Sequence, residues 1–145
     1  MKDFLMMLLF AKSVLLTPQP IDLYGVIEIK PNKPLKAITS GAHLSIDISK
    51  GIVDIQEMLR MGILERQKKI KQLVPSRTIK AELYSGKNQP TVFYYDGNFM
   101  YTNTSIFLTL DSNLEVPTDV EFDKVILTSN IKLNQVTITW VNFAK

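Results

Sequence analysis

The sequence predicts a mainly β fold: an immunoglobulin-like antiparallel β-sandwich of about seven strands, with one helical insertion and a hydrophobic N-terminal segment. Three observations support this class. Short stretches alternate apolar and polar residues with a period of two, as half-buried strands do. Turn-forming residues separate these stretches, and one internal segment changes to a helical period. The 145 residues are also enough to bury one core. We therefore expect a single sandwich domain over residues 21–145.

The first twenty residues, MKDFLMMLLFAKSVLLTPQP, form the hydrophobic segment. An early lysine followed by an apolar run is typical of a signal peptide, whereas Asp3, Lys12 and the lack of a small-x-small cleavage site argue against one. The run is also short for a membrane span. Pro18 and Pro20 then separate it from the following chain. We expect residues 1–20 to act as a signal, an anchor or a docking helix.

Two strands and a helical insertion are expected next. The stretch DLYGVIEIKP, residues 22–31, is rich in β-branched residues and ends at a proline. The stretch GAHLSIDISKG, residues 41–51, places four apolar residues on one face and polar residues on the other. Apolar residues then recur at three- and four-residue steps, which predicts a helical insertion near 52–74. Gly62 allows this insertion to be two shorter helices.

The remaining chain follows a β pattern. The stretch PTVFYYDGNFMYT, residues 90–102, carries Asp-Gly-Asn between two aromatic runs, which predicts a hairpin. Further strands are expected at residues 77–85, 105–112, 123–129 and 135–143. Short alternating strands in this number favour a sandwich, and a small barrel that uses the helix as a plug is the alternative.

No stretch carries a specific motif for catalysis. The chain has no cysteine, which excludes thiol nucleophiles and cysteine-ligated metals. His43, Ser45 and Asp47 share one strand face, but such neighbours stand about 7 Å apart and no nucleophile elbow accompanies them. The acidic stretch DSNLEVPTDVEFD has Val116 and Phe122 where a calcium loop needs glycine and a bidentate carboxylate. We therefore predict no catalytic, cofactor-binding or metal-ligating residue, and no enzyme.

Two groups of side chains are candidate binding surfaces. Aromatic residues cluster on neighbouring strands, and alternation places rings on both faces, so one face could stack against a partner. The residues of this tyrosine surface are Tyr84, Tyr94, Tyr95 and Tyr101. The second candidate is a basic patch for an anionic partner, made of Arg66, Lys68, Lys69 and Lys71. Core packing of the rings and a solvated helix face are the simpler interpretations.

The charge distribution bears on partners. Bases dominate residues 60–80 and acids dominate residues 111–123, although the net charge is only +3. This pattern favours separate basic and acidic surfaces. The mild net charge and the lack of a recognisable module argue against nucleic acid. We predict a non-enzymatic binding or assembly module, exported or at a cell envelope, that contacts a protein partner or forms a homo-oligomer.

Other functions stay open at this point. The chain could be a structural subunit of a larger particle, such as a secretion apparatus or a virion, with its N-terminal segment buried in a neighbour. It would then be a cytoplasmic or virion component. A membrane surface could also be contacted through the N-terminal segment. A carbohydrate-binding module, or a hydrolase built from dispersed carboxylates, has the weakest support because nothing selects the residues.

Overall fold

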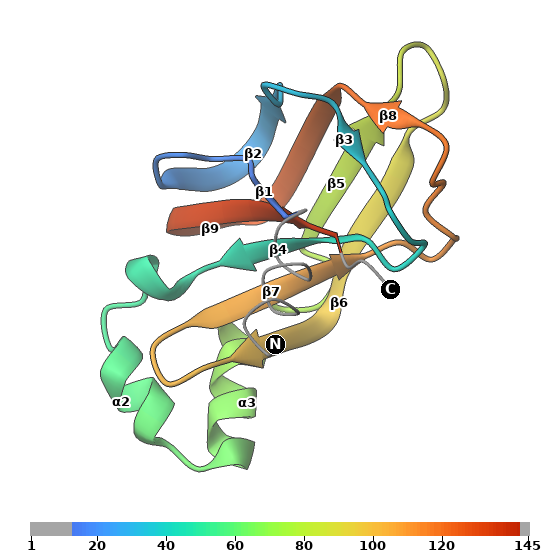
Figure 1. Ribbon diagram of the computed structural model, residues 1–145. Helices are drawn as coiled ribbons and strands as arrows, with labels where there is room; N and C mark the ends of the chain where they lie inside the picture. Colours follow the sequence, from blue (N-terminus) through green and yellow to red (C-terminus); the bar gives the residue numbers. More distant parts are fainter. Residues whose placement is uncertain (1–12, 143–145) are drawn as a thin grey trace, which may run out of the picture.

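The computed structural model describes residues 13–142, which form a mainly β fold as the sequence predicts. Five strands pair in a closed ring to make a barrel (Figure 1). Around the ring they are β9 (Lys124–Val141), β4 (His43–Asp47), β7 (Ile106–Asp111), β6 (Thr91–Tyr101) and β5 (Ile79–Tyr84), which pairs with β9 again. Every neighbouring pair is antiparallel. The mainly β class is therefore confirmed, whereas the immunoglobulin-like sandwich is not, because the sheet closes on itself.

One long strand closes the barrel. β9 pairs with β5 through its first half and with β4 through its second half. Between the halves, Gln135 has a left-handed backbone with a φ of 51°, and its N–H donates to Oδ1 of Asp22 at 3.0 Å. The strand therefore bends without ending. The prediction of two strands, at 123–129 and 135–143, is wrong, since both stretches belong to one strand.

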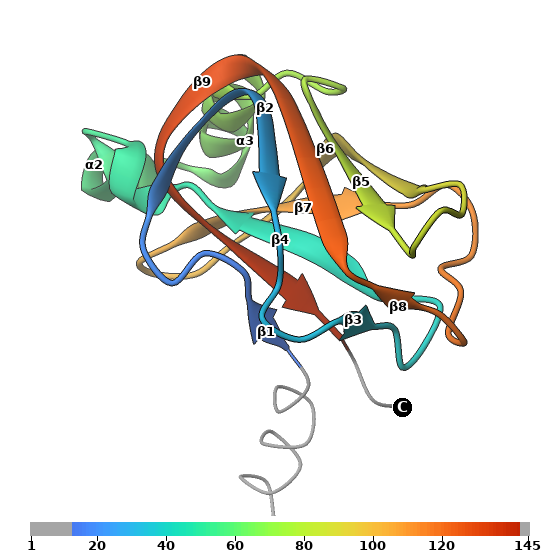
Figure 2. The ribbon, with the colours of Figure 1, turned by 90° about the horizontal axis from the view of Figure 1, so that it is seen from above.

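Two further strands run along β9. β2 (Ile21–Ile29) follows β9 around its bend, so that the two strands form an arch (Figure 2). β1 (Val14–Leu15) pairs with the last part of β9, at Trp140 and Thr139. β1 and β2, which precede the ring in sequence, thus extend the sheet beyond β9.

The predicted N-terminal segment, residues 1–20, contributes to the fold at its end. Leu16 and Thr17 are buried, and Oγ1 of Thr17 accepts the N–H of Ile138 at 2.9 Å. Packing on the barrel therefore begins before residue 21. Residues 1–12, which hold most of the apolar run, lie outside the described residues.

The predicted hairpin within residues 90–102 is wrong. Strand β6 continues through this stretch, and its register with β7 shifts between Tyr95 and Phe99. Gly97 has a φ of 93°, so it supplies the left-handed residue of a bulge and not a hairpin turn. The turn to β7 comes later, where the N–H of Thr102 donates to the carbonyl of Ser105 at 2.9 Å.

The core fills the barrel interior with the inward residues of the five ring strands. Its largest side chain, Trp140, meets Phe93 and Phe122 edge to face at centroid distances of 5.9 and 6.1 Å. Phe122 comes from a separate two-stranded sheet of β3 (Leu35–Lys36) and β8 (Glu121–Phe122). Other fully buried members include Leu23 of β2 and, on the ring strands, Leu44, Ile46, Ile79, Leu83, Tyr95, Ile106, Leu108, Leu110, Leu127 and Ile138.

The helical insertion is confirmed as two short α-helices after a 3-10 turn, η1 (Ser49–Gly51). α2 (Ile55–Arg60) and α3 (Ile63–Leu73) lie at one end of the barrel (Figure 1). Met58 of α2 and Ile70 of α3 anchor them, because both side chains are buried. Within the described residues, no helix is long and apolar enough to cross a membrane.

Candidate functional site

Two residues of the predicted tyrosine surface lie on the outside of the barrel. Tyr84 and Tyr94 alternate with buried neighbours on β5 and β6. The ring of Tyr84 is covered by Nζ of Lys124, 4.7 Å from the ring centroid, and the ring of Tyr94 by the guanidinium carbon of Arg77, at 4.6 Å. Arg77 is also bound by Asp96 at 2.7 Å. These rings therefore form cation–π pairs with their own chain and not one open stacking platform.

Tyr84 also has an acidic neighbour. Its hydroxyl donates to Oε2 of Glu82 at 3.3 Å. Desolvation and then the Glu82 carboxylate raise the pKa of Tyr84. Both effects keep the phenol neutral at ordinary pH, so nothing here activates it as a nucleophile or base.

The other two tyrosines are placed differently. Tyr95 is fully buried, so it belongs to the core and not to the predicted surface. Tyr101 lies near the helices, with the guanidinium carbon of Arg66 at 4.2 Å from its ring centroid and Phe99 beside it. The four predicted residues are thus spread over two exposed places and the barrel interior, and they do not form one surface.

The Tyr95 hydroxyl leads to a stability prediction. It is buried without a hydrogen-bond partner, so Tyr95→Phe is expected to raise the free energy of unfolding by roughly 1 kcal/mol at neutral pH. Burial raises the pKa of Tyr95 above its ordinary 10.0. When the pH rises past 10, the phenol of the unfolded chain ionises before that of the folded chain, so the wild-type protein loses stability. The advantage of Tyr95→Phe should therefore widen in alkali. Urea unfolding of both proteins at neutral and alkaline pH measures this difference in the free energy of unfolding.

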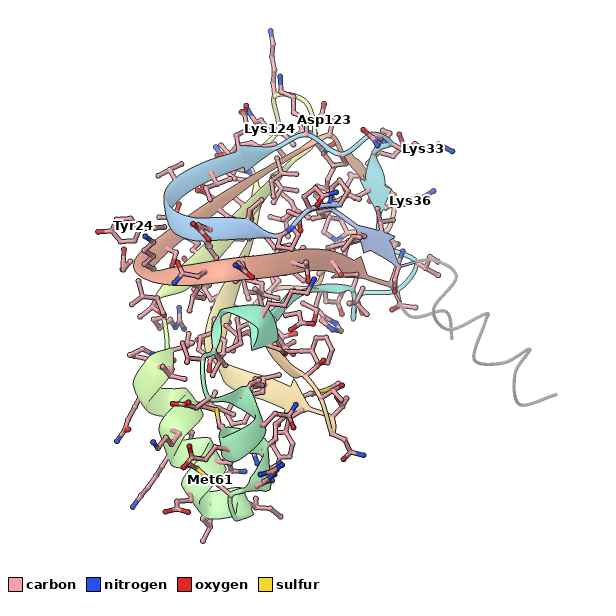
Figure 3. The ribbon with its side chains drawn as sticks, turned by 90° about the vertical axis from the view of Figure 1, so that its left-hand side faces the viewer. Tyr24, Lys33, Lys36, Met61, Asp123 and Lys124 are labelled. Atoms are coloured by element: carbon pink, nitrogen blue, oxygen red, sulfur yellow. The ribbon has the colours of Figure 1, made fainter. Side chains whose placement is uncertain are left out.

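A matched control for this substitution is Tyr24→Phe, because Tyr24 is exposed on β2 (Figure 3). It should change stability by less than about 0.5 kcal/mol. A Tyr95→Phe variant that is less stable than the wild type at every pH would show that the hydroxyl has a partner, such as a buried water.

The four residues of the predicted basic patch have different surroundings. The Nη2 of Arg66 donates to the carbonyls of Leu59 and Met61, at 3.0 and 2.9 Å, and so caps the end of α2. Together with the contact to Tyr101, these bonds give Arg66 a structural role. Lys68 and Lys71 lie on the outward face of α3, whereas Lys69 faces a groove on its other side.

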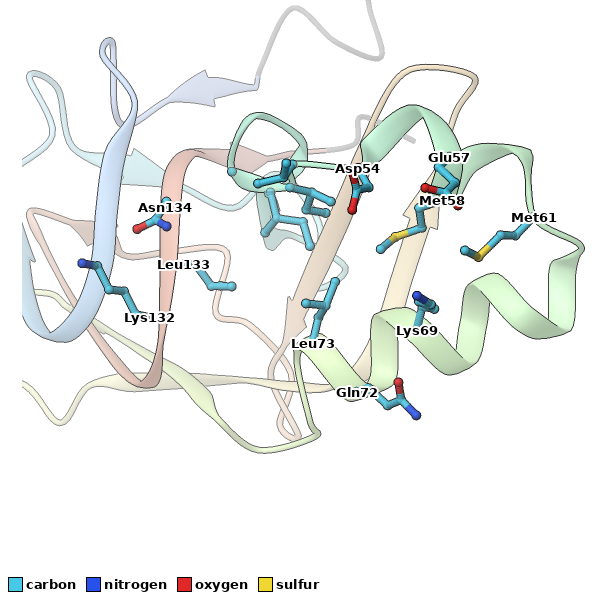
Figure 4. Close-up of a pocket in the computed structure, with 14 residues that line it drawn as sticks. Asp54, Glu57, Met58, Met61, Lys69, Gln72, Leu73, Lys132, Leu133 and Asn134 are labelled. Atoms are coloured by element: carbon cyan, nitrogen blue, oxygen red, sulfur yellow. The ribbon is translucent and has the colours of Figure 1, made fainter.

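This groove is a concave feature that the sequence did not indicate. It lies between η1 and α2, α3 and the bend of β9, with a volume of about 530 Å³ (Figure 4). Val53, which is 96% exposed, and Leu73, which is 46% exposed, stand at its opening. The other apolar side chains that line it are Ile48, Ile52, Met58, Met61 and Leu133.

Charges of both signs surround the groove. Asp54 and Glu57 come from the start of α2, and Lys69 of α3 lies across the groove from them (Figure 4). Lys132 of β9 adds a second base. Within the described chain, the ion pairs shorter than 4 Å involve none of these four residues. The groove therefore combines apolar walls, flexible methionines and a charged rim that is open to a partner.

The outer edge of β2 also carries an exposed ring and an exposed apolar side chain, those of Tyr24 and Val26. Among the described strands, β2 pairs only with β9. Gly25 has a φ of 71° and interrupts the extended backbone between the two exposed residues. A bend of this kind protects an edge against pairing with another chain. We therefore place the candidate site in the groove.

Asp47, on the predicted polar face of β4, makes local hydrogen bonds. Oδ1 of Asp47 accepts both the N–H and the hydroxyl of Ser49, at 2.9 and 2.6 Å, which fixes the turn after β4. In the described part of the chain, no three His, Asp or Glu side chains gather in a way that could hold a metal ion. Comparisons with protein-family models, curated proteins and solved structures gave no match. We therefore base the functional assignment on the groove.

Proposed function

We propose that this chain is a non-enzymatic assembly module whose groove takes up an apolar segment of a second copy. The observation that supports this is the apolar lining between the helices and β9, with Val53 and Leu73 exposed at its opening. Exposed apolar residues beside an apolar hollow are typical of a surface that a partner covers. The mixed charges of the rim would set the orientation of that partner.

The occupant that we propose is the run from Phe4 to Phe10, FLMMLLF. It offers seven apolar side chains, and Lys2, Asp3 and Lys12 around it provide charges of both signs for the rim. Full burial of a leucine, methionine or phenylalanine side chain contributes about 1.5–3 kcal/mol, so a few such contacts are enough for a stable complex.

Chain length favours a second copy over the same copy. Strand β1 begins with Val14 opposite Trp140, whereas the groove lies at Asn134. Trp140 and Asn134 are six residues apart on β9, a distance of about 20 Å along the strand. The three steps from Ser13 to Phe10 span about 10 Å at most. The apolar run therefore cannot fill its own groove along its whole length, whereas a neighbour's groove imposes no such limit.

Disrupting the groove is expected to weaken self-association. Val53→Glu combined with Leu73→Glu places charge at the opening of the groove, and we expect the dissociation constant to rise at least tenfold, which is about 1.4 kcal/mol. Light scattering after size-exclusion chromatography, over a range of concentrations, measures the change. Leu114→Glu is the matched control, because Leu114 is equally apolar and exposed in the loop before β8.

A complementation experiment tests the occupant. Leu5→Glu with Leu8→Glu should also give monomers, since the donated segment is then charged. Mixed with the groove variant, this chain supplies an intact groove and the groove variant supplies an intact segment, so one contact should form again. A wild-type chain that stays monomeric at high concentration would contradict the proposal, and so would loss of association in Leu114→Glu.

A further inference from the structure

The outward face of α3 carries bases beside exposed apolar residues. Ile63 and Leu64 begin the helix with side chains 61% and 79% exposed, although both are large and apolar. Lys68 and Lys71 follow one and two turns later on the side of Leu64, and all three residues line one shallow hollow. The helix thus exposes apolar side chains at its start and positive charge behind them.

These bases are available to a partner. Arg60, Lys68 and Lys71 are exposed, and none takes part in the ion pairs found among residues 13–142. Glu65 is the acid that shares the hollow with the two lysines. Arg66, by contrast, is held by carbonyl groups and Tyr101, so it shapes the helix pair and leaves the outer charge to the lysines.

The shape of this face bears on the kind of partner. Met61 marks the end of the helical pair that points away from the barrel (Figure 3). A projecting tip has no walls to grip a rigid protein, whereas a lipid surface deforms around it. Apolar residues that enter the head-group region, next to bases that meet anionic lipids, are the usual composition of helices that bind at a membrane surface.

We propose that the α2–α3 tip docks on an anionic lipid bilayer, with Ile63 and Leu64 entering the interface and Lys68 and Lys71 contacting the head groups. This contact uses the opposite side of α3 from the groove, so it is separate from the assembly function proposed above. A membrane-bound copy would keep its groove accessible to a neighbour.

Vesicle binding tests this contact. The full chain is sedimented with vesicles of phosphatidylcholine alone and with vesicles that also contain phosphatidylserine, at low and high salt. We expect binding to the anionic vesicles that salt weakens. Lys68→Gln with Lys71→Gln should lower this binding about 30-fold, because each base near such a surface contributes about fivefold. Leu64→Gln should lower it severalfold.

The matched control is Lys33→Gln with Lys36→Gln. These lysines are exposed and lie far from the tip (Figure 3), and the substitution changes the net charge equally. Their loss should change binding by less than about twofold. An equal loss in both lysine pairs would overturn the proposal, since net charge alone would then explain the attraction. Equal binding to both kinds of vesicle, or no binding, would overturn it as well.

Discussion

Replacing Trp140 by alanine is expected to remove about 4 kcal/mol from the free energy of unfolding, the largest loss that we predict for one side chain. Trp140 is fully buried and packs edge to face on Phe93 of β6 and Phe122 of β8. Its Nε1 also donates to the carbonyl of Lys36 at 3.2 Å. Alanine therefore leaves a cavity where the ring strands and the small sheet meet. Since domains of this size are stable by about 5–15 kcal/mol, the loss is a large part of the total.

Urea unfolding followed by far-ultraviolet circular dichroism measures this effect. With a typical m-value for urea, we expect the midpoint of unfolding to fall by roughly 2 M. Fluorescence is unsuitable because Trp140 is the single tryptophan. Trp140→Phe is the control: it keeps an aromatic ring and loses the hydrogen bond, so it should cost less than half as much. A midpoint for Trp140→Ala within about 0.5 M of the wild-type midpoint would contradict the assigned core.

Local sequence patterns predicted the elements that local rules control. Strict alternation located β4 and β5, and the three- and four-residue spacing located the helices, including their separation near Gly62. Closure of the sheet depends on a different feature. β9 continues through residues 130–135, although the adjacent polar residues Asn134 and Gln135 shift the phase of its alternation, because β2 supports the bend through Asp22. That support comes from the other end of the sequence, so no local pattern could reveal it.

The Asp-Gly-Asn stretch shows the same limit. A glycine with a left-handed backbone serves a hairpin turn and a bulge equally well, and only the pairing of β6 with β7 decides between them. This affected the tyrosine surface, since a hairpin would have placed Tyr95 and Tyr101 on adjacent strands. In one continuous strand, Tyr95 points into the barrel and Tyr101 lies at the helices.

The candidate site was the hardest part to predict. The groove combines residues from η1, α2, α3 and β9, and its lining residues Ile48 and Asn134 are 86 positions apart in the chain. The local signal for the groove was small: Val53 is an apolar residue outside the three- and four-residue steps that predicted the helices. The basic run, by contrast, was visible at once, but its division into a capping Arg66 and outward lysines depends on contacts in three dimensions.

Gly51→Ala should show how tightly the groove depends on the bend of β9. A Cβ at Gly51 would lie 2.9 Å from the carbonyl carbon of Asn134 and closer still to its oxygen. Both are backbone atoms, so η1 or β9 must move, and we expect a loss of about 3 kcal/mol, the upper end for overpacking. Because Gly51 and Asn134 both line the groove, the displacement should also weaken self-association.

Gly62→Ala is the matched control, because nothing lies within 4 Å of a Cβ at that position. Gly62 precedes α3 with a φ of −61°, which alanine also adopts. Restriction of the unfolded chain favours alanine while the loss of a preferred N-cap residue opposes it, so the net change should stay within about 0.5 kcal/mol. Urea unfolding and light scattering measure the stability and the self-association of both variants. If Gly51→Ala unfolds and associates like Gly62→Ala, the contact between η1 and the bend of β9 does not determine the shape of the groove.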